Sequence, residues 1–263
     1  MNLRHCLKLW CVVAAVLVAL PAAAALICSE GFDYEVGSEL HEQNGGVGWA
    51  EPWTNVTFGI RVTNVVGLTY PGWITQGDAA AWACRSAQMI RKHPNLPGND
   101  GDVVWFSLLF HITNPSASRV HFAGTGGSTT GFGIELVSTG GGGVQARIGG
   151  NVGATAPAAL MQTHLVIGKF VFSNDTPDHL DVWVNPASWI TELALGPADT
   201  VREAAGSFGS VVYVRTTDTT PMVNAYVCDE LRLGETLMDV TLIPEPAAVG
   251  AVALLMAIYA RKR

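Results

Sequence analysis

The chain has 263 residues, of which 15 are Lys or Arg and 22 are Asp or Glu, so its formal net charge is −7. Five of the basic residues and one acidic residue lie outside residues 26–243, which leaves 10 basic and 21 acidic residues there and a net charge of −11. An acidic domain disfavours nucleic acid as a partner, because phosphate backbones are bound mainly through Lys and Arg. The charge is compatible with calcium or a neutral glycan, or it only keeps the domain soluble.

Residues 1–25 have the pattern of a secretory signal peptide. Arg4 and Lys8 come first, an apolar run from Leu9 to Leu20 follows, and small residues end the segment at Ala22–Ala25. This order is typical of a signal helix that is cleaved on export, here after Ala24 or Ala25. The alternative is an uncleaved anchor, which the length of the run disfavours because a membrane-spanning helix needs about 20 apolar residues.

The central part, 26–243, is predicted to be one all-β domain. Short runs bounded by Gly, Pro, Asn and Asp recur along it, and several alternate with period two, as in Leu180–Val184. Alternation is typical of half-buried strands, and regularly spaced short strands predict a sandwich or jelly roll. The predicted strands are Phe58–Thr63, Ala81–Ile90, Val103–Thr113, Arg119–Ala123, Gly131–Ser138, Val144–Ile148, His164–Ser173, His179–Val184, Val211–Arg215 and Val223–Leu233. Single helical turns are predicted at Ala156–Gln162 and Asp199–Ala205.

The segment 244–263 has three parts in a fixed order. They are a proline pair around an acid, an apolar run and a basic end: Pro244, Glu245 and Pro246; Ala247–Ala260; Arg261, Lys262 and Arg263. The prolines interrupt regular structure, and the run is short for a stable transmembrane helix. The terminal cations resist crossing the membrane, so we expect them in the cytoplasm and the domain outside.

This segment resembles the PEP-CTERM sorting signal, which has the same three parts in the same order. The resemblance implies processing by an exosortase near Pro244–Pro246 and release to the cell surface or exopolysaccharide matrix of a Gram-negative-type bacterium. The chain would then be anchored in the membrane by 247–260 only transiently. The alternative is a simple membrane anchor with chance prolines. A cell-wall sortase is disfavoured, because no Leu-Pro-x-Thr-Gly string precedes the apolar run.

The central domain resembles the concanavalin A-like, laminin-G-like jelly roll. The residues that carry the resemblance include Glu30–Tyr34, Gln43–Gly46, Val182–Pro186 and Asp229–Gly234, in this order. The resemblance implies two antiparallel sheets that pack face to face, one of them curved into a groove, with the first and last strands side by side. The alternation of Phe32, Asp33 and Tyr34 also predicts a strand there.

The resemblance suggests a calcium site where the first and last strands meet. Many jelly rolls hold calcium there with carboxylate and carbonyl oxygens, and the sequence offers Glu30, Asp33 and Asp229. The alternative is that these acids are solvated charges at a sheet edge. If the two strands are neighbours, Cys28–Cys228 is the preferred disulfide; otherwise these cysteines and Cys84 are buried thiols.

The sequence contains no catalytic motif that we can assign. There is no His-Glu-x-x-His, Gly-x-Ser-x-Gly or Cys-x-x-Cys, and no Glu-x-Asp-x-x-Glu string like that of jelly-roll hydrolases. His111 and His121 flank a turn and could meet on paired strands, as a metal or glycan contact or as polar residues of a half-buried sheet.

The leading hypothesis is a non-catalytic surface or biofilm-matrix protein that binds polysaccharide. The Trp residues could provide flat surfaces for sugars or fill the core. The alternative is a carbohydrate-active enzyme, a glycoside hydrolase or polysaccharide lyase, on the same scaffold.

Overall fold

The computed structural model describes residues 26–55, 62–82, 88–112, 118–125, 130–137, 141–216 and 226–241. The predicted signal segment 1–25, the predicted sorting segment 244–263 and Cys84 lie outside the described residues. Within the described part, no helix is long and apolar enough to span a bilayer.

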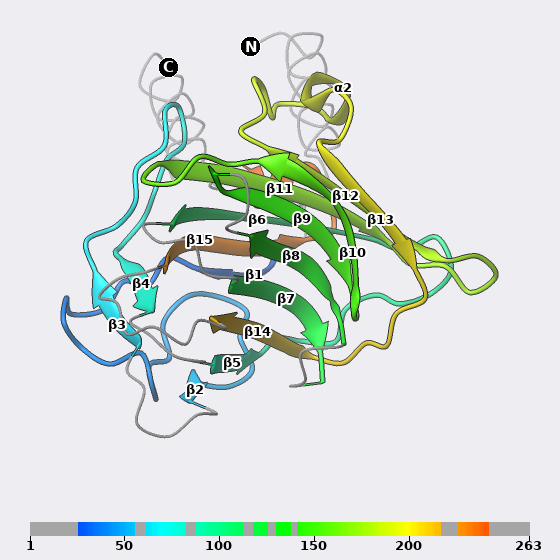
Figure 1. Ribbon diagram of the computed structural model, residues 1–263. Coiled ribbons are helices and arrows are strands. Elements are labelled where there is room, and N and C mark those ends of the chain that lie inside the picture. Colours follow the sequence, from blue (N-terminus) through cyan, green and yellow to red (C-terminus); the bar gives the residue numbers. More distant parts are fainter. Residues whose placement is uncertain are drawn as a thin grey trace, which may run out of the picture.

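The described residues are mostly β-strand, arranged in two antiparallel sheets that face each other (Figure 1). Sheet A has the strand order β13-β12-β11-β6-β15-β4-β3, with β1 also paired to β15, and sheet B has the order β10-β9-β8-β7-β14-β5-β2. The strands of sheet A are β1 (Leu26–Glu30), β3 (Val62–Val65), β4 (Ala79–Trp82), β6 (Val103–Ile112), β11 (Thr163–Val171), β12 (Asp178–Val184), β13 (Thr200–Ala204) and β15 (Tyr226–Gly234). Those of sheet B are β2 (Thr54–Asn55), β5 (Gln88–Lys92), β7 (Ser118–Gly124), β8 (Phe132–Val137), β9 (Gly143–Ile148), β10 (Asn151–Pro157) and β14 (Val211–Thr216). The helices are α2 (Glu192–Leu195) and α3 (Leu237–Thr241).

Phenylalanine rings from both sheets form the centre of the core. Phe132 of β8 stacks on Phe170 of β11 with ring centroids 4.1 Å apart, and Phe106 of β6 lies 4.7 Å from Phe122 of β7. All four side chains are fully buried. Burying one such ring stabilises the fold by about 1.5–3 kcal/mol, so these contacts hold the sheets together.

A second apolar layer covers the outer face of sheet A. Its buried members are Trp73, Trp105, Leu109, Leu165, Ile167, Trp183, Leu195, Leu237 and Val240. They come from the middle strands of the sheet, from the β3–β4 loop and from both helices. Strands β6 and β11 are therefore buried on both faces, which explains why their sequences are almost continuously apolar.

The prediction that the first and last strands lie side by side is confirmed. Strand β1 pairs antiparallel with the second half of β15, from Leu26 opposite Gly234 to Glu30 opposite Leu231. On its other side β15 pairs with β6, and it is buried throughout.

The predicted Cys28–Cys228 disulfide is not present, since both cysteines are buried and free. The register places Cys28 opposite Leu233, five residues along β15 from Cys228. At about 3.3 Å per residue this separation exceeds the roughly 7 Å between Cα atoms that a disulfide can bridge.

Several predicted elements differ in the structure. The predicted strand 81–90 falls on two strands: 81–82 end β4 in sheet A, 88–90 begin β5 in sheet B, and 83–87 lie outside the described residues. Residues 199–205, predicted as a helical turn, contain strand β13, and the first two residues of the turn predicted at 156–162 are the end of β10. Phe32 is not on a strand, since its φ of 52° lies in the left-handed region. The predicted strand 58–63 overlaps β3 only at its end, and its first residues lie outside the described ones.

Candidate functional site

The outer face of sheet B carries four ionisable side chains, which we call the charged cluster: Arg119, His121, Glu135 and Arg147. They come from β7, β8 and β9, which lie side by side (Figure 1). The register places Arg119 opposite Glu135, and His121 opposite Gly133, which in turn pairs with Arg147. Successive side chains alternate between the two faces of a strand. The residues that alternate with these four along β7, β8 and β9 belong to the core, so the cluster faces away from sheet A.

Glu135 joins the two arginines of the cluster. Arg119 Nη2 donates to Glu135 Oε1 at 3.3 Å, Arg119 Nε lies 3.3 Å from Oε2, and Arg147 Nη1 donates to Oε2. Arg119 is the most accessible of the three, with a side chain that is 19% exposed. These three side chains carry two positive charges and one negative charge, and an excess of positive charge suits a ligand carboxylate.

His121 lies fully buried in this cluster as a neutral imidazole. Burial lowers its pKa to about 3, and the positive charges of Arg147 and Arg119 act in the same direction. Its neighbour Gly133 has a φ of 154°, and a Cβ there would be 2.0 Å from the carbonyl oxygen of Val120. Only glycine fits at this position, so no side chain of β8 separates His121 on β7 from Arg147 on β9.

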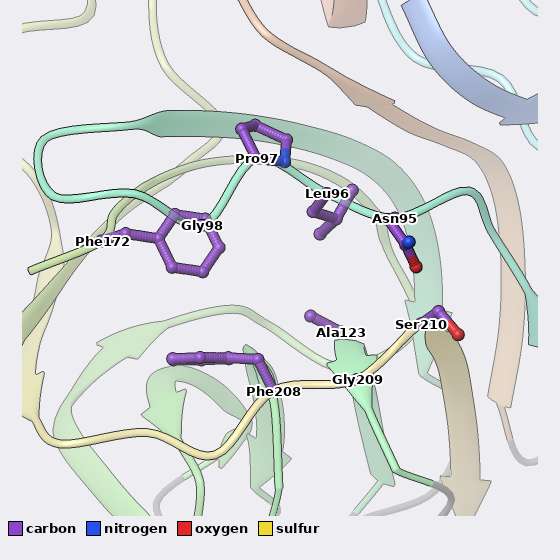
Figure 2. A pocket seen from close by; sticks show the side chains of 9 residues that line it. All are labelled: Asn95, Leu96, Pro97, Gly98, Ala123, Phe172, Phe208, Gly209 and Ser210. Atoms are coloured by element: carbon purple, nitrogen blue, oxygen red, sulfur yellow. The ribbon is translucent and has the colours of Figure 1, made fainter.

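A cavity of about 460 Å³ lies away from this cluster, between the ends of several strands (Figure 2). It is lined by Asn95, Leu96, Pro97, Gly98, Ala123, Phe172, Phe208, Gly209 and Ser210. Phe172 and Phe208 lie on one side, while Asn95 and Ser210 lie at one end. None of the lining side chains is ionisable, so the cavity offers space but no acid, base or metal ligand. The charged cluster is therefore the better candidate site.

The structure does not bring the predicted calcium ligands into one site. Glu30 is committed to the backbone N–H of Phe32 and to an ion pair with Arg91. Asp33 is exposed. Asp229 is buried and accepts hydrogen bonds from the N–H groups of Leu68 and Glu230. Among the described residues, no three His, Cys, Asp or Glu side chains form a group that could hold a metal ion.

The predicted meeting of His111 and His121 is wrong, because β6 belongs to sheet A and β7 to sheet B. His111 instead lies near Thr163 on β11. The tryptophans mostly fill the interior: Trp53, Trp73, Trp105 and Trp183 are buried, and Trp49 and Trp189 are half-buried. They form no open aromatic platform among the described residues.

Comparison with known proteins gives a likeness of fold only. A scan against family models and a search of curated proteins found no match. Among solved structures, the chain is similar to an endo-β-1,4-glucuronan lyase from the fungus Trichoderma reesei, with 14% identity, a TM-score of 0.46, and coverage of 78% of this chain and 96% of that one. It is also similar to domain 4 of AbnA, a GH43 extracellular arabinanase from Geobacillus stearothermophilus, in complex with arabinotriose, with 14% identity, a TM-score of 0.49, and coverage of 83% and 97%.

A third similar structure is the carbohydrate esterase vb_24B_21 from the Shiga toxin-encoding bacteriophage phi24B, with 12% identity, a TM-score of 0.49, and coverage of 81% of this chain and 100% of that one. These comparisons assign no family. At such identities and scores they carry no argument about what this chain binds or does.

Sequence reasoning did not single out Arg119 or Glu135. The available signal was ionisable residues at alternate positions inside apolar strands, as in Arg119-Val120-His121 and in Gln145–Ile148. This pattern indicates that each charge lies on the face opposite the core. It does not indicate that the three strands are neighbours, which depends on pairing between distant segments.

Proposed function

We propose that this chain is an exported, concanavalin A-like jelly-roll protein that binds polysaccharide through the charged cluster without catalysing a reaction on it. The observation that supports this most is the convergence of Arg119 and Arg147 on the single carboxylate of Glu135. The more accessible of the two guanidinium groups, that of Arg119, suits a second carboxylate, supplied by the ligand. The proposed ligand class is a polysaccharide with carboxylate groups, such as a polyuronate.

This ligand class differs from the neutral glycan that the net charge of the domain suggests. Charges on the surface are screened beyond about 8–10 Å at ordinary ionic strength. The two guanidinium groups within the site therefore act on a bound sugar more strongly than the acids elsewhere on the domain. Local charge sets the ligand class, and net charge affects mainly the rate of encounter.

Delivery to the surface is the second part of the proposal. The signal segment 1–25 would direct export, and the tail would hold the chain in the inner membrane until an exosortase cleaves near Pro244–Pro246. The polysaccharide partner would then be met on the cell surface or in the extracellular matrix. The mass of the mature protein from an exosortase-containing host tests this part, and a product that still ends in Arg263 would exclude it.

A pair of probes that differ only in charge tests the binding part. Oligoglucuronate and cello-oligosaccharides share the β-1,4 backbone but differ in the carboxylate, and titration calorimetry measures both. We expect binding of oligoglucuronate that weakens with added salt, and at least tenfold weaker binding by Arg119→Gln.

Lys169→Gln is the matched control for this experiment. Lys169 is also ion-paired, and its side chain is 21% exposed against 19% for Arg119, but it lies on sheet A. We expect this variant to bind like the parent chain. Equal binding of both probes, or equal losses in both variants, would contradict the proposed site.

A polysaccharide lyase is the alternative, but the one candidate base of the cluster, His121, is fully buried and has a pKa of about 3, which disfavours this reaction. In such a reaction a base takes the C5 proton of a uronate, the C4–O4 bond breaks, the leaving oxygen gains a proton, and a C4=C5 double bond forms. A hydrolase is less favoured, because retaining and inverting enzymes use two carboxylates and the cluster contains one. Formation of an ultraviolet-absorbing unsaturated product from oligoglucuronate, lost in His121→Gln, would establish the lyase instead of the binding protein.

A further inference from the structure

Exposed aliphatic side chains gather on the β3–β4 loop and around α2, both at the top of Figure 1. The exposed fractions are 58% for Ile74, 74% for Ile190 and 93% for Leu193. Tyr70 and Trp189, on the same two segments, are half-buried. We call these five residues the apolar face. Large apolar side chains grouped on a surface indicate an interaction site more often than single ones do.

The two segments that form the apolar face pack against each other. The ring of Trp189 lies 6.2 Å from that of Tyr70 and 5.5 Å, edge-on, from that of Trp73. Trp73 and Leu195 in turn belong to the buried layer on sheet A. The two segments that carry the exposed side chains therefore lie next to each other and are anchored to this layer.

The predicted membrane tail leaves the described structure from this same layer. Leu237 and Val240 of α3 are members of the layer with Trp73 and Leu195, and α3 is held there by a hydrogen bond from Ser107 Oγ to the carbonyl oxygen of Val240, at 2.6 Å. Only residues 242–246 separate α3 from the apolar run 247–260. Five residues span at most about 18 Å, so a tail inserted in a bilayer keeps this side of the domain near the lipid surface.

We propose that the apolar face rests on the interfacial region of the lipid bilayer while the tail is inserted. This inference rests on the insertion of the tail that forms part of the proposed function. Tyr and Trp side chains are favoured at the level of the headgroups, and exposed Ile and Leu side chains gain from burial in the acyl boundary. The contact would supplement an apolar run that is too short to hold the chain firmly, and would keep Pro244–Pro246 at the surface where cleavage is proposed.

The proposed membrane contact also determines the direction in which the charged cluster points. The apolar face belongs to the side of sheet A that is turned away from sheet B, whereas the charged cluster lies on the outer face of sheet B. With the apolar face against the bilayer, the charged cluster points away from it, toward extracellular polysaccharide.

Environment-sensitive probes on the full chain test the contact. The chain is reconstituted into vesicles of phosphatidylethanolamine and phosphatidylglycerol, and a nitrobenzoxadiazole label is attached to Leu193→Cys. The control is Val47→Cys, whose parent side chain is 62% exposed in the loop before β2. A third probe at Ala257→Cys, within the apolar run, reports insertion of the tail. The parent chain, labelled in parallel, gives the background from its own 5 cysteines.

We expect the Leu193 probe to shift its emission to the blue and to be quenched by lipids that carry a spin label high on the acyl chain, and the Val47 probe to behave as in water. A quenched Ala257 probe with a water-like Leu193 probe would overturn the proposed contact and leave the tail intact. Two unquenched probes, at Ala257 and Leu193, would overturn the inserted tail as well. A blue shift at Leu193 without quenching by spin-labelled lipid would mean that protein, a second copy or the segment 247–260, covers the face, and would also overturn the proposal.

Discussion

Glu30, the last residue of β1, and Arg91, on β5 of the opposite sheet, form an ion pair in which each side chain is at most 1% exposed. Arg91 also donates to the carbonyl oxygens of Glu51 and Gly45, at 2.9 and 2.8 Å, and lies 4.9 Å from the ring centroid of Trp49. These contacts fix the long loop between β1 and β2 against the edge of the sandwich. The motif that carried the resemblance to a jelly roll therefore has a structural role.

Removing one partner of this pair should destabilise the fold strongly. Arg91→Met leaves the carboxylate of Glu30 buried without its cation, and such a change costs about 3–5 kcal/mol. Lys92→Met is the matched control, since the neighbouring Lys92 pairs with Glu51 at the surface and such pairs contribute about 0–1 kcal/mol. Urea denaturation of the parent and both variants measures the difference. Similar losses of unfolding free energy in the two variants would show that the buried pair stabilises the fold no more than the surface pair does.

The buried carboxyl of Asp229 should make stability fall as pH rises. Burial and, after it, the neighbouring charge of Glu230 raise its pKa from 3.8 to about 8. Because the folded state binds this proton more tightly, the stabilising contribution is complete below about pH 4 and is lost as pH rises through about 8. We expect the free energy of unfolding of the parent chain, minus that of Asp229→Asn, to decrease between pH 4 and pH 8. Thermal or urea unfolding at several pH values measures it, and parallel curves would contradict the assignment.

The strands at the centre of each sheet could be predicted from the sequence, and those at the edges mostly could not. β6 and β11 carry long runs of Val, Ile, Leu and Phe, because they are buried on both faces. β10 and β13 contain Gly, Ala, Glu and Asn, which have low strand propensity, and only pairing with β9 and β12 makes them strands.

The candidate site depended on information that the local sequence does not contain. Glu135 is 16 residues from Arg119 and 12 residues from Arg147 along the chain, and the three meet because β7, β8 and β9 pair in one register. A shift of one residue would turn each of them into the core. The predicted calcium ligands show the opposite case. Their strands are neighbours as expected, but Glu30 and Asp229 are used to hold loops.

Cys28 and Cys228 should react slowly with alkylating reagents in the folded protein. Burial raises the pKa of both thiols well above the usual value, so neither presents a thiolate at neutral pH. At pH 8 we expect iodoacetamide to modify both cysteines at least tenfold faster in the denatured chain than in the folded one. Peptide mass mapping measures the modification, and a 28–228 cross-linked peptide under non-reducing conditions would show that the predicted disulfide forms after all.

His121 should contribute to acid denaturation with the sign opposite to that of Asp229. Its pKa in the folded protein is about 3 against 6.5 for an ordinary histidine, because burial and the charges of Arg147 and Arg119 disfavour the imidazolium. The unfolded chain therefore binds more protons between these values, and the contribution to stability is present above about pH 6.5 and lost as pH falls through about 3.

The test of this assignment is the variant His121→Gln, which cannot titrate. The free energy of unfolding of the parent chain, minus that of His121→Gln, should decrease as pH falls from 6.5 to 3. Over part of the same range the difference for Asp229→Asn should change in the other direction, so each variant controls for a general effect of pH on the fold. A parent chain that loses no stability relative to His121→Gln in acid would mean that folding does not lower the pKa of the imidazole, and it would overturn this assignment. Such a histidine would be charged below about pH 6.5 and would then add a third positive charge to the cluster.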